Sequence, residues 1–501
     1  MLAPAPSAAQ YRGMPHVIVQ NCCNDASCVP ECPVDCIHPT PDEPGFATAE
    51  MLYIDPDVCI DCGACIDACP VSAITTDYEL TDEMAPFEEI NAAYYRAVGS
   101  AADLDHPYAD PQLGRRRPAS DAEPLSVAVV GAGAAGHYTV SELQHRIDVR
   151  AEIDVYERLP EPGGLVRFGV APDHADTKKV QEQFAAARGR SGVTVHLGVS
   201  VGENVTHEEL ARTHHAVVYA VGALHGRPLP LPGGDLPVVA AAADFVAWYN
   251  GHPDFAGHPF DLSHERVVVL GNGNVALDVA RVLTADPELF VGTDMSDEAL
   301  AALRASRVRE VVVLARRGAD HAAFTAPELV GLARTVPVVV DAADLSDLGA
   351  EPADPQAAHY VRQKLELLRD LAAAPSPAPD ARRVVLRFGT PPTAVTEATG
   401  GAVVEFDEHG TPSSLECGLV LAAIGLRGTS VPGVPFDEAG GIIPNADGRV
   451  LGSDGAPLPG VYTAGWVKRG PTGVIGTNRY DARSTVDALV ADFHAGLLSA
   501  E

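Results

Sequence analysis

The sequence predicts an α/β protein in which a small cysteine-rich α+β domain precedes two doubly wound domains. Nine of the ten cysteines lie between Cys22 and Cys69, and the tenth stands alone near the other end of the chain. A buried strand, a glycine turn and a helix are predicted at 125–144, and the same plan recurs at 265–283. Strand patterns alternate with helix patterns over the remaining chain, which is typical of doubly wound domains.

Changes in composition divide the 501 residues into several segments, as expected for a chain of this length. We expect the cysteine-rich domain at 1–80. A linker rich in Pro, Ala and charge is expected at 81–124, with a short helix in its middle. The first doubly wound domain is expected to combine 125–225 with 428–501, and the second to occupy 226–427.

The net charge of the protein disfavours some classes of binding partner. The formal net charge of -33 disfavours nucleic acid and anionic membrane surfaces, because both require positive charge on the protein. No run of 18 apolar residues is present, and the N-terminal segment lacks the basic start and apolar stretch of a signal peptide. We therefore expect a cytoplasmic protein without a membrane span. In that compartment, crowded cysteines indicate a metal site rather than disulfides.

The later cysteine run, "CIDCGACIDACP", has the spacing C-x2-C-x2-C-x3-C-P. This is the bacterial spacing for iron–sulfur clusters, in which the fourth cysteine of each run binds the other cluster. We therefore expect a [4Fe–4S] cluster on Cys59, Cys62 and Cys65 from this run and Cys32 from the earlier one.

The earlier run, "CCNDASCVPECP", has the same plan with one cysteine replaced. Cys22 and Cys28, with Cys69 from the later run, are the expected thiolate ligands, and Asp25 stands where a further cysteine belongs. Because a carboxylate is a harder ligand than a thiolate, we expect [3Fe–4S] here, or a labile [4Fe–4S] with Asp25 as fourth ligand. The alternatives are a solvated Asp25, and Cys23 as a ligand in place of Cys22.

Zinc is the alternative metal for the cysteine-rich domain. Zinc prefers two pairs of closely spaced cysteines that supply four tetrahedral sulfurs. Two interleaved runs with seven usable cysteines fit that arrangement poorly. Cys23 and Cys36 are left over, and either can be an inert buried thiol.

The glycine turn that follows the strand at the start of 125–144 has the pattern of a dinucleotide site. Gly131 makes the tight turn, Gly133 lets a pyrophosphate approach the backbone, and Gly136 lets helix and strand pack closely. Glu157 ends the next strand, where it can accept hydrogen bonds from ribose hydroxyls. The alternative is a structural strand–turn–helix unit.

The second glycine turn, "GNGNVA", contains Gly271, Gly273 and Ala276. The strand that follows ends in Arg316 and Arg317 instead of an acid. Two guanidinium groups suit a 2′-phosphate, which favours NADP over NAD. An acidic, alanine-rich segment at 285–308, expected to be a helical insertion, accounts for the long spacing. The alternative is a solvated basic turn.

The motifs resemble two known families. The cysteine-rich domain resembles bacterial two-cluster ferredoxins of the seven-iron type, through "ECPVDCIHP" and "MLYIDPDVCIDCGACIDACPVSAI". The close Cys22–Cys28 spacing departs from that pattern. Residues 125–501 resemble the adrenodoxin reductase family of ferredoxin–NADP reductases, through "GGLVRFGVAPDH", "GNGNVALDVAR", "ARRG" with "AFTAPEL", and "TAGWVKRGPTGVIGTN". This resemblance implies two Rossmann-like domains, one for FAD and one for NADP(H).

The second resemblance also implies site residues. The FAD contacts it implies are Ala135, Glu157, Leu165, Val201, Trp466, Gly473, Val474 and Ile475. The NADP(H) contacts it implies are Arg227, Asn272, Gly273, Asn274, Val275, Arg316, Arg317, Glu328 and Gly473. His174 is implied to lie near the isoalloxazine ring as a catalytic helper, and a surface histidine that caps a helix is the alternative.

We therefore expect a ferredoxin–NADP reductase with a fused ferredoxin. NADPH gives two electrons at once, a cluster accepts one, and a flavin converts between the two. The expected partner is an external one-electron acceptor, such as a free ferredoxin or a cytochrome P450 system. One alternative is the electron-supplying small subunit of a glutamate synthase, and another is a non-enzymatic zinc scaffold. A dithiol–disulfide reductase is disfavoured, because no C-x-x-C pair follows residue 69.

Overall fold

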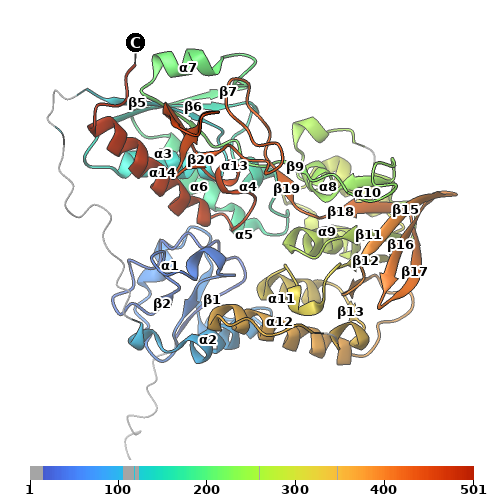
Figure 1. Cartoon of the computed structure of the whole chain (residues 1–501). Helices are drawn as coiled ribbons and strands as arrows, with labels where there is room; N and C mark the ends of the chain where they lie inside the picture. The colour runs from blue at the N-terminus through green and yellow to red at the C-terminus, as the bar shows by residue number, and fades with distance from the viewer. Residues whose placement is uncertain (1–14, 105–117, 119–122, 259, 347, 501) are drawn as a thin grey trace, which may run out of the picture.

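Figure 1 shows an N-terminal domain, in blue, beside two larger domains. It lies next to helix α14 (Thr477–His494) of one and next to α11 (Ala326–Thr335) and α12 (Pro355–Ala373) of the other. The computed structural model describes residues 15–104, 118, 123–258, 260–346 and 348–500.

The N-terminal domain is built from two small antiparallel sheets and short helices. Strand β1 pairs with β4, and β2 pairs with β3. The strands are β1 (His16–Ile18), β2 (Ile37–His38), β3 (Tyr53–Ile54) and β4 (Ile74–Thr76). The helices are η2 (Phe46–Thr48), α1 (Ala64–Ala68), η3 (Asp77–Glu79), α2 (Pro86–Val98) and η4 (Ala101–Asp103).

Helix α2 corrects the expected linker at 81–124. The short helix expected there exists, but its apolar face is buried in the core of the N-terminal domain, where Tyr94 stacks on Tyr53 with ring centroids 4.1 Å apart. Asn91 accepts hydrogen bonds from the backbone N–H groups of Ile18 and Ile54, which joins the two sheets. The prediction of a linker from 81 onward was therefore wrong for this helix, and residues 105–117 and 119–122 lie outside the described residues.

The first doubly wound domain is a seven-stranded sheet in the order β20-β21-β22-β8-β5-β6-β7. Its strands from β22 to β7 run parallel. The strands are β5 (Leu125–Val130), β6 (Ala151–Glu157), β7 (Val193–Leu197), β8 (Ala216–Tyr219), β20 (Asn445–Ala446), β21 (Arg449–Leu451) and β22 (Pro457–Thr463). Besides α14, the helices are α3 (Ala134–His145), α4 (Gly164–Phe168), α5 (Ala175–Lys178), α6 (Val180–Arg188), α7 (His207–Thr213) and α13 (Trp466–Arg469).

The second doubly wound domain is a six-stranded parallel sheet in the order β10-β18-β11-β12-β14-β13. An antiparallel sheet of β15, β16 and β17 lies beside it, and β9 pairs with β19. The strands are β9 (His225–Gly226), β10 (Val239–Ala241), β11 (Arg266–Leu270), β12 (Glu310–Leu314), β13 (Val338–Val340), β14 (Arg383–Arg387), β15 (Pro392–Ala398), β16 (Gly401–Glu408), β17 (Thr411–Cys417), β18 (Leu419–Ala422) and β19 (Leu426–Arg427).

The helices of this domain include the expected insertion at 285–308, which is confirmed as helical. It forms η6 and α10, packed against the neighbouring α8. The helices besides α11 and α12 are α8 (Ala242–Tyr249), η5 (Pro253–Phe255), α9 (Asn274–Thr284), η6 (Pro287–Phe290), α10 (Asp297–Ala305), η7 (Ala319–His321) and η8 (Ala342–Leu345).

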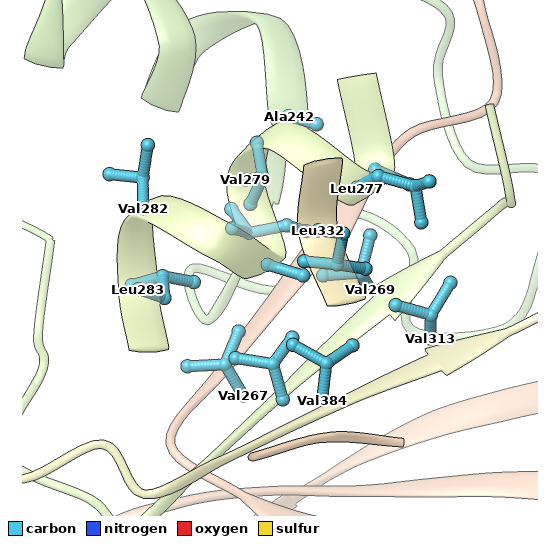
Figure 2. Packing of buried hydrophobic residues seen from close by; sticks show 14 of the residues in the cluster. Ala242, Val267, Val269, Leu277, Val279, Val282, Leu283, Val313, Leu332 and Val384 are labelled. Atoms are coloured by element: carbon cyan, nitrogen blue, oxygen red, sulfur yellow. The ribbon is translucent and has the colours of Figure 1, made fainter. Parts of the chain in front are cut away.

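The core of the second doubly wound domain explains why its parallel strands are continuous apolar runs. Val267, Val313 and Val384 come from three neighbouring strands and meet Leu277 of α9 and Leu332 of α11 in one buried cluster (Figure 2). Strands that are covered on both faces need continuous apolar runs such as "RVVVL" and "EVVVL". Burying such parallel strands places the loops that follow them, including the second glycine turn, at one edge of the sheet.

The N-terminal domain shares apolar clusters with both larger domains. Val71 of this domain packs with Tyr138 and Phe184 of the first doubly wound domain. Tyr360 on α12 and Val330 on α11 belong to the core cluster of the N-terminal domain itself. The three domains are therefore joined by buried surfaces.

Within the described part of the chain, every helix is too short or too polar to cross a membrane.

Candidate cofactor sites

The first glycine turn has space only for glycine at two of its positions. Gly131 has φ +103°, and a Cβ there would lie 2.5 Å from the carbonyl oxygen of Ala220. A Cβ on Gly136 would collide with the carbonyl oxygen of Gly131. At Gly133 a Cβ would meet only a Cα atom 3.8 Å away, so this side of the turn is open to a ligand.

Glu157 holds the same turn from the end of β6. Its two carboxylate oxygens accept hydrogen bonds from the backbone N–H groups of Ala132 and Leu159, each at 2.9 Å. Each oxygen keeps further acceptor capacity. The carboxylate can therefore position the turn and still accept from a ribose hydroxyl.

The other residues implied for FAD converge on this turn, apart from Val201. Gly164 has φ +51°, and a Cβ there would lie 2.8 Å from the Cα of Gly133, so Leu165 lies on a helix pressed against the turn. A Cβ on Gly465 would collide with Ala135, which brings the segment of Trp466, Gly473, Val474 and Ile475 to the start of α3. Val201 lies at the edge of the apolar cluster around Val130.

The second glycine turn connects β11 to α9 and lies against the start of α11. Gly271 has φ +115°, and nothing lies within 4 Å of a Cβ built on Gly273. The Asn274 side chain accepts a hydrogen bond from the N–H of Thr325 at 2.8 Å, and the Asn272 carbonyl accepts one from Phe324 at 2.9 Å. The side chain of Val275 is 40% exposed beside them.

The expected phosphate-binding arginines are exposed and available. Arg316 and Arg317 follow the end of β12, which pairs in parallel with β11, so they lie at the same sheet edge as the glycine turn. In the described part of the chain, neither guanidinium group makes a hydrogen bond or ion pair. Arg227 is also exposed and donates to the Leu426 carbonyl at 3.2 Å. Cationic groups without a protein partner are suited to an anionic ligand.

His174 does not cap a helix through its side chain, although it precedes α5. Its Nε2 atom lies 3.0 Å from Nη2 of Arg281, a side chain that is only 2% exposed. A guanidinium group can only donate, so Nε2 accepts and the proton of the neutral imidazole is on Nδ1. The alternative of a surface histidine that caps the helix is therefore wrong.

Arg281, which no sequence motif singled out, is the centre of a buried charge cluster. It donates to Asp173 at 2.7 Å and to Asp278 at 2.8 Å, and its Nη1 lies 3.9 Å from Glu328. Burial raises the pKa of the Glu328 carboxyl, and the charge of Arg281 opposes that rise. His174, Asp278 and Glu328 lie close enough for a metal ion, but all three face the Arg281 cation instead. A sequence pattern could have identified Arg281, because "VALDVAR" places this arginine on a helix face that is otherwise apolar and buried.

Five cysteines, four of them the expected ligands, line one pocket of the N-terminal domain. Cys32, Cys59, Cys62 and Cys65 surround it, as the interleaved spacing predicts, with Cys36 among them. The hydrogen bond from the Cys36 thiol lowers the pKa of Cys32 to about 6 and that of Cys59 to about 5. Burial raises the pKa of Cys65 to about 12, so iron must displace a proton there, and the four sulfurs together match the ligand set of a [4Fe–4S] cluster. We call this pocket the outer site.

Cys22, Cys28 and Cys69 line a second pocket, together with Cys23 and Asp25. The Cys69 sulfur accepts a hydrogen bond from the N–H of Ala73 at 3.2 Å. Burial raises the pKa of the Cys22 thiol to about 12, so binding of a metal must displace a proton there. We call this pocket the inner site, and three sulfurs with one carboxylate fit an iron–sulfur cluster.

Asp25 is buried, with 5% of its surface exposed, so the alternative of a solvated loop residue is wrong. Its carboxylate accepts hydrogen bonds from the hydroxyl of Ser27 at 2.5 Å and from the N–H of Ser27 at 3.2 Å. Arg479 of α14 lies 3.7 Å away. Burial raises the pKa of the Asp25 carboxyl, while Ser27 and Arg479 oppose that rise.

Two family models match the chain. A 4Fe-4S binding domain matches residues 52–75, and a pyridine nucleotide-disulphide oxidoreductase domain matches residues 125–317. The first covers the later cysteine run, and the second covers both glycine turns and the arginine pair.

Relatives are similar over the whole chain or over the reductase part. A probable ferredoxin/ferredoxin–NADP reductase of Mycobacterium tuberculosis is 51% identical over 97% of this chain and 85% of its own length. Human mitochondrial NADPH:adrenodoxin oxidoreductase is 41% identical over 74% of this chain and 79% of its own. The structure of Mycobacterium tuberculosis FprA in complex with NADPH is similar with a TM-score of 0.70 and 40% identity, covering 76% of this chain and 87% of that one. The chain therefore belongs to the ferredoxin/ferredoxin–NADP reductase family.

Proposed function

We propose that this reductase moves electrons between NADPH and an external one-electron acceptor by means of one FAD and two iron–sulfur clusters. The observation that carries the proposal is the presence of two open glycine turns and two cysteine-lined pockets in one chain with shared buried surfaces. The acceptor is a small redox protein such as a free ferredoxin, or a cytochrome P450 system.

The reductase residues in this proposal divide by cofactor. Ala132 and Leu159, braced by Glu157, shape the turn that would hold the FAD pyrophosphate. FAD supplies the conversion between two-electron and one-electron transfer. Arg316 and Arg317 would bind the 2′-phosphate of NADP(H). His174, held in one tautomer by Arg281, would donate a hydrogen bond from its Nδ1–H group.

The cluster types in this proposal follow from the donor sets. The outer site offers four cysteine sulfurs for [4Fe–4S]. The inner site offers three cysteine sulfurs and the carboxylate of Asp25, so we propose [3Fe–4S] or a labile [4Fe–4S]. The carboxylate already accepts two hydrogen bonds from Ser27, which reduces its capacity to bind iron strongly.

An anaerobic titration with NADPH tests the proposed function. The absorbance of oxidised flavin should fall, and EPR should then show reduction of iron–sulfur clusters in the same sample. In a contradicting result, NADPH would reduce the flavin but leave every cluster oxidised, while dithionite would reduce the clusters of the same sample. Electron transfer from FAD to the clusters would then be excluded.

Asp25→Cys should change the cluster at the inner site. The substitution provides a fourth thiolate, so iron content should rise from about seven to about eight per chain and both clusters should be [4Fe–4S]. Iron analysis with EPR and Mössbauer spectra of anaerobic protein checks this, with Asp25→Ala as control, which should remain three-iron. If the wild-type protein already holds two all-thiolate [4Fe–4S] clusters, Cys23 is the ligand and the role proposed for Asp25 is wrong.

A further inference from the structure

The loop from Cys22 to Cys28 is hydrogen-bonded to the start of α14. The N–H of Gly476 donates to the Cys23 carbonyl at 2.7 Å. The Asp25 carbonyl accepts from Nη1 of Arg479 at 3.0 Å and from the hydroxyl of Tyr480 at 3.2 Å. These bonds connect a cysteine loop of the N-terminal domain to the helix that follows the segment implied to contact FAD.

The fit between this loop and α14 leaves no space for a larger residue. A Cβ on Gly476 would collide with the backbone of Asn24 and Asp25. Beside it, Ile475 packs against a buried cluster that contains Cys23 and Val71, two residues that line the inner site. The wall of the inner site and the implied flavin segment are therefore neighbours.

Arg479 provides the strongest polar part of this contact. The same Nη1 atom donates to the Ser27 hydroxyl at 2.8 Å, and Ser27 in turn donates to the Asp25 carboxylate. Arg479 thus holds the loop through one backbone oxygen and one side chain. A cation held at this distance also favours negative charge at the inner site.

The outer site has a different surrounding. Cys62 is exposed, and the neighbouring Ile60 is 57% exposed. The residues that line either pocket come from the N-terminal domain, so the two sites differ in the exposure of Cys62 and Ile60 and in the hydrogen bonds that join the Cys22–Cys28 loop to α14. The side chain of Ile60 therefore faces solvent and not a reductase domain.

We propose that the inner site lies between FAD and the outer site in the order of electron carriers, and that Arg479 is the positioning residue that holds the inner site against the reductase. The proposal rests on the proposed function, because it requires two clusters and FAD. It places the outer site, beside Ile60, on the side of the external acceptor.

Two full-length double variants test the order of the sites. Cys22→Ala/Cys28→Ala removes thiolates from the inner site, and Cys59→Ala/Cys62→Ala removes them from the outer site. EPR after dithionite shows which cluster each variant keeps, and rapid-freeze EPR after NADPH shows how fast it is reduced. We expect the inner cluster to be reduced at the wild-type rate when the outer one is missing. The outer cluster should be reduced at least about 100-fold more slowly when the inner one is missing. The opposite pattern, or equal rates, would overturn the order.

Arg479→Gln tests the positioning role and remains informative if a cysteine variant fails to fold. We expect the EPR spectrum and reduction potential of the inner cluster to change, those of the outer cluster to stay as in wild type, and NADPH-driven cluster reduction to slow by about tenfold. Arg334→Gln is the matched control, because Arg334 also donates across a domain boundary, to the Asp82 carbonyl at 2.9 Å, but lines neither site.

An unchanged inner-cluster spectrum in Arg479→Gln, or the same change in Arg334→Gln, would overturn the positioning role. Failure of the proposed function gives a different result. Dithionite-reduced wild-type protein would then show one cluster only, and no comparison between inner and outer sites would arise.

Discussion

Replacing both Arg316 and Arg317 with alanine should lower kcat/KM for NADPH by about two to four orders of magnitude and leave that for NADH nearly unchanged. Both guanidinium groups are exposed at the end of β12 beside the second glycine turn. Charge-assisted hydrogen bonds to a phosphate contribute about 1.5–3 kcal/mol each, and about 1.4 kcal/mol corresponds to a tenfold change. NADH lacks the 2′-phosphate, so the double substitution removes no hydrogen bond to NADH.

Ferricyanide reduction measures this effect, because ferricyanide accepts electrons from the flavin and bypasses the clusters. Arg309→Ala is the matched control, since Arg309 precedes the other end of the same strand and its guanidinium group donates to the Asp380 carbonyl at 3.0 Å. It should leave the use of both nucleotides as in wild type. An equal loss with NADPH and NADH in the double variant would show that the pair does not read the 2′-phosphate.

Arg281→Met should strongly destabilise the folded protein. Arg281 is 2% exposed and is bonded to Asp173 and Asp278, with Glu328 at 3.9 Å. Removing one partner of a buried ion pair costs about 3–5 kcal/mol, because the remaining charges stay buried without compensation. For domains of this size, such a loss lowers the midpoint of thermal unfolding by about 10 °C.

Thermal unfolding followed by circular dichroism and by flavin release measures the effect. Arg304→Met is the control, because Arg304 makes a two-bond pair with Glu288 on the surface, and exposed pairs contribute little to stability. Arg281→Lys keeps the charge and should lose less stability than Arg281→Met. A midpoint for Arg281→Met that equals that of Arg304→Met would contradict the central role of Arg281.

The local parts of the sites could be predicted from the sequence. The turn at Gly131 and the turn at Gly271 follow apolar strands directly, and short-range sterics decide which residues fit there. The division of the cysteines between two pockets followed from spacing alone, because three cysteines on a tight loop can reach only one cluster. The residues of each glycine turn are near one another in the chain, whereas Cys32 and Cys69 each reach the site of the other run, as the ferredoxin spacing predicts.

The parts that could not be predicted depend on contacts between distant residues. Arg479 and the Asp25 carbonyl are 454 positions apart, and no periodicity or spacing connects them. The sequence pattern places helix α2 in a linker, because its apolar residues have no visible partner until Tyr53 and Tyr360 are brought beside Tyr94. A solvated Asp25 is a reasonable expectation for the same reason, since the helix that buries this residue comes from the far end of the chain.

Glu50 of the N-terminal domain fixes this domain to the nucleotide-binding domain. Its carboxylate accepts from the N–H of Ala326 at 2.7 Å, at the start of α11, and pairs with Lys364 at 3.0 Å. A separate ferredoxin must find its reductase by diffusion, and that encounter is slowed by salt where opposite charges guide it. A docked domain has a fixed, high effective concentration. Internal electron delivery is therefore first order and independent of ionic strength, and only the meeting with the outside acceptor remains sensitive to salt.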